Sequence, residues 1–252
     1  MAKWEPVLVN GRPFSAGVIL IDKPTGITSF GIVRKVRRLL GVKKVGHAGT
    51  LDPFASGLLI VCAGRGATRH IEEFMQGRKR YRAVLQLGME TETQDREGRI
   101  TATGAVPDLT PADIEQCLKG FVGPQLQAPP PFSAAKHKGK PLYHYARQGI
   151  MIRKEPRAIE IYSLCCLGYD ASTHLLECEV ACSRGTYIRV LAADIGERLG
   201  CGAHLHALRR TESSGFTVED ALAGTLLDAD NALEHLLSAM MSVDQALACT
   251  KK

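Results

Sequence analysis

The sequence predicts an α+β fold, in which a mixed and largely antiparallel sheet is flanked by helices. Three observations support this class. Apolar residues make up 45% of the 252 residues and charged residues 23%, which is typical of a globular protein. Short apolar or alternating runs of strand length lie between stretches with helical periodicity. These elements do not follow the regular spacing of repeated strand–helix–strand units, so a purely parallel sheet is not expected.

The first elements are a buried strand and an amphipathic helix. Residues 17–21 (GVILI) have the composition of a short buried strand, and the run from Lys23 to Gly26 is typical of a turn. A helix should follow, with Thr28 or Ser29 as its N-cap and Gly41 as its stop. Its basic residues lie mostly off the apolar face, so they can contact a partner. The residues expected on the apolar face are Phe30, Val33, Val36 and Leu40.

A glycine-rich loop, GHAGTLDPFASG at 46–57, separates this helix from the next strand at 58–62. A helix is then expected over 67–75, and the alternating residues 81–87 predict a third strand. A helix with Thr110 as its cap and Pro111 in its first turn should end near Gly120.

The second half of the chain begins with a proline-rich, basic and tyrosine-bearing stretch at 123–155, which suits an excursion from the core. Residues 157–164 and 175–181 predict a hairpin, and 186–199 a helix. The tail from residue 217 is acidic and weakly helical.

Positive charge is unevenly distributed along the chain, whose formal net charge is +6. Residues 1–216 contain 30 Lys and Arg against 20 Asp and Glu (+10), whereas residues 217–252 contain 2 against 6 (−4). Basic clusters lie at 34–44, 65–82 and 136–140. Each alone could be an ordinary solvated surface, but three together favour a nucleic-acid backbone as the partner.

Several classes of protein are disfavoured. No run of 18 apolar residues predicts a membrane-spanning helix, and the first residues lack the apolar segment of a signal peptide, so we expect a cytoplasmic protein. The eight cysteines are then expected to be free buried thiols. A zinc site is a minor alternative, because paired short ligand spacings are missing. Its candidate ligands are His174, Cys178, Cys182, His204 and His206.

The loop at 46–57 is the best candidate for a reactive site. The chain has no phosphate loop, zinc-protease helix, nucleophile elbow or dinucleotide-binding glycine motif. Glycines let this loop turn sharply and approach a ligand closely. Asp52, in the middle of it, could act as a covalent nucleophile if a nearby cation keeps it ionised. By itself an Asp-Pro pair is more often a turn.

Several ordered segments carry a family resemblance. They are DKPTGITS at 22–29, GVKKVGHAGTLDPFASGLLIVCAGRGATR at 41–69, KRYRAVLQLG at 79–88, the proline-rich run before Ser133 with SAAKHKGKPLYHYARQG at 133–149, and CSRGTYIRVLAADIGERLGCGAHLHALRR at 182–210. Over most of residues 17–216 the chain resembles the bacterial tRNA pseudouridine-55 synthases of the TruB family. The resemblance implies a pseudouridine synthase fold with an RNA-binding insertion at about 123–155.

The resemblance also implies roles for individual residues. Asp52 matches the family's nucleophile, and Arg189 matches the arginine that pairs with it and would hold it ionised. Tyr81 matches the tyrosine that stacks on the target base. His47 matches the histidine that fills the RNA loop once bases have flipped out. Without the resemblance, an ordinary structural role would be preferred for Arg189, Tyr81, His47 and Leu208. The remaining implied substrate contacts are Tyr187 and Leu208.

The implied reaction converts uridine 55, in the T-arm loop of tRNA, to pseudouridine after the base has left the stack. The N1–C1′ bond breaks and a C5–C1′ bond forms, so the atoms balance and no cofactor or metal is expected. Asp52 could add to C6 of the base or act at C1′, and Tyr81 is only a candidate for removing the C5 proton. We expect the tRNA T stem-loop as the partner and a monomer that needs no protein partner.

Three alternatives remain. A guide-RNA-dependent synthase of the related archaeal and eukaryotic branch would rely on partner proteins and on a small C-terminal RNA-binding domain. Residues 1–216 match a catalytic domain, whereas 217–252 resemble a helical tail and not that small domain. A non-catalytic tRNA-binding or tRNA-folding module would not need Asp52 and Arg189 together. An aspartate-dependent glycosidase would need two carboxylates.

Overall fold

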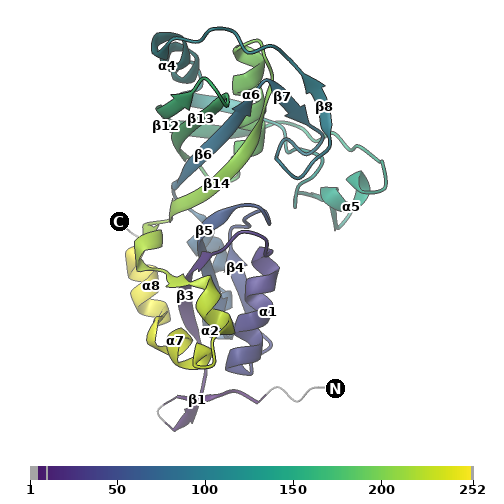
Figure 1. Ribbon diagram of the computed structural model, residues 1–252. Helices are drawn as coiled ribbons and strands as arrows, with labels where there is room; N and C mark the ends of the chain where they lie inside the picture. The colour runs from purple at the N-terminus through teal and green to yellow at the C-terminus, as the bar shows by residue number, and fades with distance from the viewer. Residues whose placement is uncertain (1–4, 10, 251–252) are drawn as a thin grey trace. The chain divides into compact units, whose positions relative to one another are not determined.

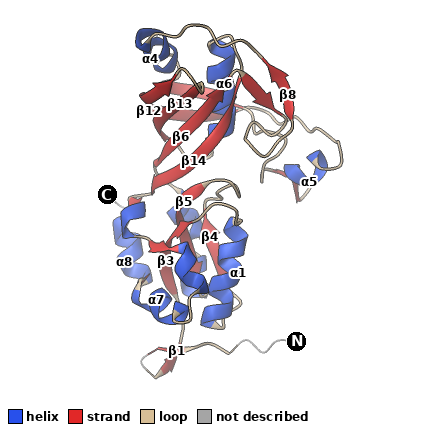
Figure 2. Ribbon diagram, viewed as in Figure 1, coloured by secondary structure: helices blue, strands red, loops and turns tan. Residues whose placement is uncertain are grey.

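The computed structural model describes residues 5–9 and 11–250; the ends of the ranges predicted for the domain and the tail, 1–4 and 251–252, lie outside them. The chain divides into two compact units. The first contains the residues up to Lys79 and those from Arg209 onward, and the second is Arg80–Leu208. Both units contain strands and helices, and the sheet is mixed, which confirms the α+β class (Figures 1 and 2).

The sheet of the first unit is built on β3 (Gly17–Lys23), the strand predicted from GVILI. It pairs antiparallel with β5 (Ser56–Ala63), which pairs antiparallel with β4 (Val45–Ala48). The last residues of β14 (Ala203–Ser213) pair with β5 in parallel. Residues 46–48 were expected to begin the glycine-rich loop, but they belong to β4, so the loop is shorter than predicted.

Residues after 213 complete the first unit with both strands and helices. Short strands β16 (Leu222–Ala223) and β17 (Met240–Met241) pair with β3, and β15 (Phe216–Thr217) pairs with β14. The helical elements of this segment are η1 (Val218–Asp220), η2 (Gly224–Asp228), α7 (Ala232–Ser238) and α8 (Val243–Cys249). A hairpin of β1 (Leu8–Val9) and β2 (Arg12–Pro13) lies near the N-terminus.

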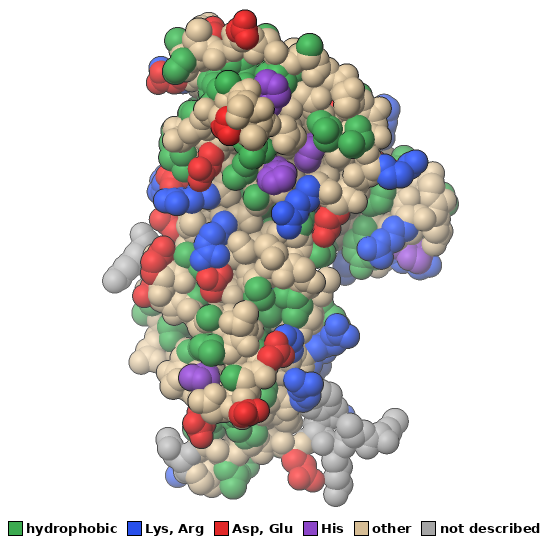
Figure 3. All heavy atoms as spheres, in the orientation of Figure 1, with side chains coloured by type: hydrophobic (Ala, Val, Ile, Leu, Met, Phe, Trp, Pro, Cys, Tyr) green, Lys and Arg blue, Asp and Glu red, His purple; other side chains and the backbone are tan. Residues whose placement is uncertain are grey.

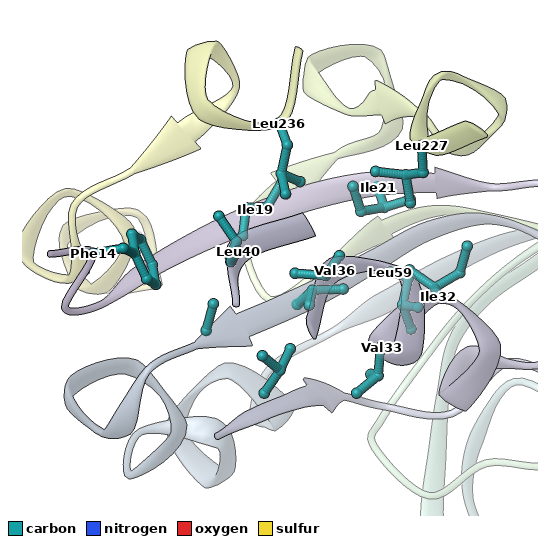
Figure 4. Packing of buried hydrophobic residues seen from close by; sticks show 13 residues of the cluster. Phe14, Ile19, Ile21, Ile32, Val33, Val36, Leu40, Leu59, Leu227 and Leu236 are labelled. Carbon is teal, nitrogen blue, oxygen red and sulfur yellow. The ribbon is translucent and has the colours of Figure 1, made fainter. Parts of the chain in front are cut away.

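Helix α1 (Ser29–Leu40) has the ends that the sequence predicts. The Thr28 side chain accepts a hydrogen bond from the Gly31 amide, and Gly41 ends the helix with φ 64°, a conformation that suits glycine. Its apolar residues pack on one face of the sheet, against residues of β3, β5 and the C-terminal segment (Figure 4). The labelled members of this core are Phe14, Ile19, Ile21, Ile32, Val33, Val36, Leu40, Leu59, Leu227 and Leu236.

Phe30 departs from the prediction for α1. It was expected on the buried face, but its side chain is 53% exposed. The guanidinium groups of Arg34 and Arg37 lie 6.0 and 5.3 Å from the centroid of its ring. The ring therefore lies at the surface beside two cations and not in the core.

The other face of this sheet is covered by a second apolar cluster that includes Phe74, Phe216 and Ala246. The helix expected over 67–75 is divided into α2 (Arg65–Thr68) and α3 (Ile71–Met75).

The second unit contains a largely antiparallel set of strands. Their order is the first part of β14, then β6 (Lys79–Leu87), β13 (Leu175–Cys182), β12 (Arg157–Asp170) and β9 (Gly123–Gln127). The predicted hairpin is β12–β13. The sequence did not predict β14, or the hairpin of β7 (Met89–Thr91) and β8 (Ile100–Thr103).

Helices α4 (Pro111–Lys119) and α6 (Ile188–Arg198) belong to this unit, and α4 has the predicted cap at Thr110. The excursion expected at 123–155 begins later than predicted, because β9 pairs with β12 in the sheet. Beyond β9 lie β10 (Lys136–His137), β11 (Lys140–Pro141) and α5 (Leu142–Ala146). No helix in the described part of the chain is long and apolar enough to cross a membrane.

Candidate active site

Asp52 lies half-buried on the loop that joins β4 to β5 in the first unit. A turn brackets it, since the Ala55 amide donates to the Asp52 carbonyl at 3.2 Å. On its C-terminal side, the Pro53 carbonyl accepts from the Gly26 amide at 2.8 Å and is 3.4 Å from Lys23 Nζ. The loop is therefore tied to the turn between β3 and α1, the segment that includes DKPTGITS.

The N-terminal side of the same loop is fixed by Ser29, the first residue of α1. Its hydroxyl donates to the Leu51 carbonyl at 3.0 Å and accepts from the Leu51 amide at 2.9 Å. Both side chains are buried. Burial strengthens these bonds and makes their loss costly, because water cannot replace them. Asp52 thus follows Leu51, whose backbone amide and carbonyl are both hydrogen-bonded to Ser29.

A buried arginine supports the base of the loop. Arg210, on β14, is 1% exposed; its Nε donates to the Leu58 carbonyl at 2.7 Å and its Nη2 to the Gly49 carbonyl at 3.1 Å. These two carbonyls lie on either side of Asp52 in the sequence. Gly57 pairs with Arg210, and a Cβ at Gly57 would lie 2.2 Å from the Arg210 carbonyl oxygen, so only glycine fits.

His47 lies on β4, opposite Val61 of β5. Burial lowers the pKa of His47, and the positive charge of Arg210 lowers it further. Its Nδ1 is buried and has no hydrogen-bond partner within the described residues. The neutral form of the His47 ring is therefore favoured near pH 7.

Arg189 lies in the first turn of α6 in the second unit and is only 4% exposed. Its Nη1 donates to the Thr93 carbonyl and its Nη2 to the Phe132 carbonyl, both at 2.7 Å. Nη1 is also 3.6 Å from Oδ2 of Asp95, which is buried as well. Asp95 accepts in turn from the Thr93 hydroxyl at 2.6 Å. The guanidinium is therefore held by two backbone carbonyls, and beside it lies the buried carboxylate of Asp95, which the sequence did not predict.

Tyr187, the residue before α6, is held through its backbone by Gln127. The Tyr187 amide donates to Oε1 of Gln127 at 2.7 Å, and Nε2 of Gln127 donates to the Tyr187 carbonyl at 3.1 Å. Gln127 is 6% exposed, which makes this reciprocal pair a rigid joint between β9 and α6.

Tyr81 and Leu208 lie on β6 and β14, which are neighbouring strands. Their side chains are 6% and 8% exposed. The six predicted residues thus form two groups. Asp52 and His47 belong to the first unit, and Tyr81, Tyr187, Arg189 and Leu208 belong to the second.

The excursion after β9 presents aromatic and basic side chains together. The rings of His137 and Tyr145 meet edge to face with centroids 5.7 Å apart, and Arg147 lies 5.5 Å from the ring centroid of Tyr143. Tyr143 is 42% exposed. This combination suits contact with a nucleic acid.

All eight cysteines are free, as predicted, but only five are buried: Cys165 and Cys166 are exposed and Cys249 is half-buried. Among the residues that the structure describes, no group of three or more His, Cys, Asp or Glu is arranged to hold a metal ion. Burial raises the pKa of the Cys62 thiol to about 12, and burial also raises the pKa of Cys178.

Two family models match this chain in succession. Residues 37–188 match the model described as TruB family pseudouridylate synthase (N terminal domain). Residues 189–248 match the model described as tRNA pseudouridylate synthase B C-terminal domain.

Curated relatives are similar over most of the chain. A tRNA pseudouridine synthase B of Desulfotalea psychrophila is 55% identical over 236 residues, which are 92% of this chain and 96% of that protein. One of a Marinomonas species is 42% identical over 250 residues, covering 93% of this chain and 78% of the relative.

Solved structures share the fold. The chain matches one in a crystal structure of a Cbf5–Nop10–Gar1 complex with a TM-score of 0.69 and 31% identity, over 91% of this chain and 61% of that one. It also matches one in a structure of an H/ACA RNP bound to a substrate RNA containing 2′-deoxyuridine, with a TM-score of 0.67 and 27% identity, over 91% and 60%. The chain therefore spans about three fifths of these solved chains.

Proposed function

The chain belongs to the TruB family of pseudouridylate synthases, and on that premise we propose that it isomerises uridine 55 in the T-arm loop of tRNA. The observation that carries the proposal is the anchoring of the Asp52 loop. Leu51 and Pro53, on either side of Asp52, are each held by hydrogen bonds from residues 23–29. Such anchoring limits the positions that a carboxylate can take, which is what a nucleophile requires.

In the proposed reaction Asp52 is the nucleophile. It adds to C6 of the uracil ring or attacks C1′ of the ribose; in either case the N1–C1′ bond breaks and the base rotates. C5 then bonds to C1′, the C5 proton leaves to a base and N1 gains a proton, so that product and substrate have the same atoms. Asp52 is released when its bond to the nucleotide breaks.

The other predicted residues bind and orient the nucleotide in this proposal. Arg189, whose guanidinium is held by the Thr93 and Phe132 carbonyls, stabilises and aims the carboxylate of Asp52. Tyr81 stacks on the extruded base, and Tyr187 and Leu208 contact it. His47 fills the space left in the RNA loop, and its lowered pKa supports this role because a neutral ring is less costly to desolvate.

The excursion around residues 133–150 is proposed to contact the T-arm and to become more ordered when RNA binds. Its interleaved tyrosine and basic side chains support this role. The enzyme is proposed to act as a monomer, without a protein partner, in the cytoplasm where its tRNA substrate is found.

The decisive experiment is release of tritium from tRNA that carries [5-³H]uridine. We expect wild-type protein to release one equivalent per tRNA, and none from a tRNA with cytidine at position 55. Asp52→Asn should abolish release while retaining tRNA affinity, because it removes the nucleophile and leaves the phosphate contacts in place. Asp230→Asn, which neutralises an exposed aspartate, is the matched control and should react normally.

Three results would contradict parts of the proposal. Turnover by Asp52→Asn within tenfold of wild type would exclude Asp52 as the nucleophile. Release that persists with cytidine at position 55 would exclude that position. Release only after addition of a guide RNA and partner proteins would support the guide-dependent alternative.

A further inference from the structure

Helix α1 presents a basic groove on its exposed face, away from the residues that pack into the core. The groove has a volume of about 320 Å³. Its lining residues recur at the spacing of one helix face: Ile27, Gly31, Arg34, Lys35 and Arg38. In the space-filling view, Lys and Arg side chains gather over this part of the first unit (Figure 3). None of the residues proposed above for the reaction lies on this face.

The cations on and beside this face differ in whether they form ion pairs or hydrogen bonds within the protein. Lys35 forms an ion pair with Asp228, and Arg37 donates to the Val45 carbonyl at 2.7 Å. Arg34 and Arg38 are exposed. Within the described residues Arg38 has no ion pair or hydrogen bond, and Arg34 has neither but lies beside the ring of Phe30. These two arginines can therefore bind an external anion.

Phe30 lies along one edge of this face. More than half of its side chain is exposed, although burial of a phenylalanine is normally favourable by about 1.5–3 kcal/mol. Arg34 and Arg37 lie against its ring. An exposed aromatic ring flanked by guanidinium groups is a surface on which bases stack.

The groove begins next to the Asp52 loop. Ser29, at the start of α1, forms a hydrogen bond with Leu51 of that loop. The Lys23 ammonium donates to the carbonyls of both Ile27 and Pro53, so Lys23 links the first residue of the groove to the loop. From Gly31 to Arg38 the helix rises by about 10 Å at 1.5 Å per residue. That length corresponds to about three nucleotides of a helical strand at 3.4 Å each.

We propose that the groove of α1 binds the sugar-phosphate backbone of the substrate RNA beside the nucleotide that reacts with Asp52. Arg34 and Arg38 contact successive phosphates, and Phe30 stacks on a base of the same strand. This inference rests on the proposed function, since the bound RNA is the substrate of that reaction.

The observations favour RNA over an acidic protein as the occupant. No acidic residue lies between Lys23 and Leu51 in the sequence, and Asp228 pairs with only one of the three cations that line the groove, so the face attracts any polyanion. However, the two arginines lie about one helical turn apart, beside a ring on which a base can stack. This arrangement matches the repeating phosphates and bases of a nucleic acid, and a polypeptide has neither. Guanidinium groups also match phosphate geometry by donating two parallel hydrogen bonds.

The inference predicts the salt dependence of RNA binding. Each phosphate contact contributes about 0.7–0.9 to the slope of log K against log salt concentration. For a fluorescent T-arm stem-loop, Arg38→Ala should lower the magnitude of that slope by about this amount, and Arg38→Lys should retain it. Arg12→Ala is the matched control, because it removes one exposed positive charge from the β1–β2 hairpin, and its slope should equal that of wild type.

Two further measurements locate the contact. Ethylation of the phosphates that flank the target uridine should weaken binding of the RNA to wild type. For one of those phosphates, ethylation should no longer weaken binding of the RNA to Arg38→Ala. Phe30→Ala should weaken RNA binding about tenfold, the loss of one base–aromatic stack. Phe30→Leu should weaken binding as much, because leucine keeps an apolar side chain but offers no ring. Phe30→Tyr should bind normally.

The outcomes separate this inference from the proposed function. If wild type releases tritium but Arg38→Ala keeps the wild-type slope and ethylation pattern, the groove does not bind substrate RNA and the inference is overturned. It is also overturned if Arg38→Ala loses affinity for polyglutamate while its RNA slope is unchanged, since the occupant is then an acidic protein. If wild type releases no tritium at all, the proposed function fails on its own assay.

Discussion

Ser29→Ala tests whether the Asp52 loop is held from α1. The substitution removes one oxygen and leaves the amide and the carbonyl of Leu51 without the partners that lie 2.9 and 3.0 Å away. Leu51 is 3% exposed, so water does not readily replace them. At about 1–3 kcal/mol for each unsatisfied buried group, the free energy of unfolding should fall by about 2–6 kcal/mol.

Thermal unfolding measures the loss of stability. For a chain of this size the melting temperature should fall by at least about 4 °C, at 2–4 °C per kcal/mol. Single-turnover tritium release at saturating enzyme should also slow, because Asp52 follows the released residue. Ser238→Ala is the matched control, since its exposed hydroxyl bonds only the His235 carbonyl and its loss should change stability by less than about 0.5 kcal/mol. A loss below about 1 kcal/mol for Ser29→Ala, with normal turnover, would refute the anchoring argument.

Three further predictions follow from other contacts. Asp95→Asn should lower the free energy of unfolding by about 3 kcal/mol and slow turnover more than it weakens RNA binding, because the buried guanidinium of Arg189 loses the negative charge of Asp95; equal stability in urea unfolding would contradict this. Since the pKa of His47 lies below its ordinary 6.5 in the folded protein, the unfolded chain takes up the proton first, and stability attributable to His47 should be present above pH 6.5 and lost as pH falls below it. His47→Asn should flatten that part of the profile, and identical profiles would exclude His47 as its cause. Cys62, buried with a pKa of about 12, should resist iodoacetamide at pH 8 in the native protein and react once urea unfolds it, as peptide mass spectrometry would detect; rapid labelling of native protein would disprove this.

The elements that the sequence predicts well are those defined by local signals. Thr28 and Gly41 mark the two ends of α1, and Thr110 marks the start of α4, because caps act on backbone groups within one helical turn. The hydrophobic run of β3 likewise identifies a buried strand. Phe30 was assigned to the wrong face because periodicity alone treats every apolar side chain at the right angle as core. Two arginines on the same helix accept that ring at the surface instead.

The residues that support the candidate site could not be found in the same way. Asp95 is distant in sequence from Arg189, and nothing near it in the chain marks a buried ion pair. Strand β14 escaped prediction because Arg210 occupies a fully buried position, where an alternating pattern would require an apolar residue. In the sequence, Ser29 cannot be distinguished from any other serine near the start of a helix. In each case the residue's interaction partner is distant in the sequence and is brought close only by the fold.

The division of the chain has a consequence for its synthesis. The first unit is interrupted after Lys79 and resumes at Arg209, so 129 residues must be translated between its two parts. At about 5–20 residues per second this interval lasts about 6–26 s. During it, β3 has neither β16 nor β17 beside it, and Ile19 and Ile21 lack Leu227 and Leu236. The nascent first unit therefore exposes apolar surface on the ribosome while the second unit, whose residues are contiguous, is being translated. Holding of that surface by a chaperone would lower the risk of aggregation during the interval.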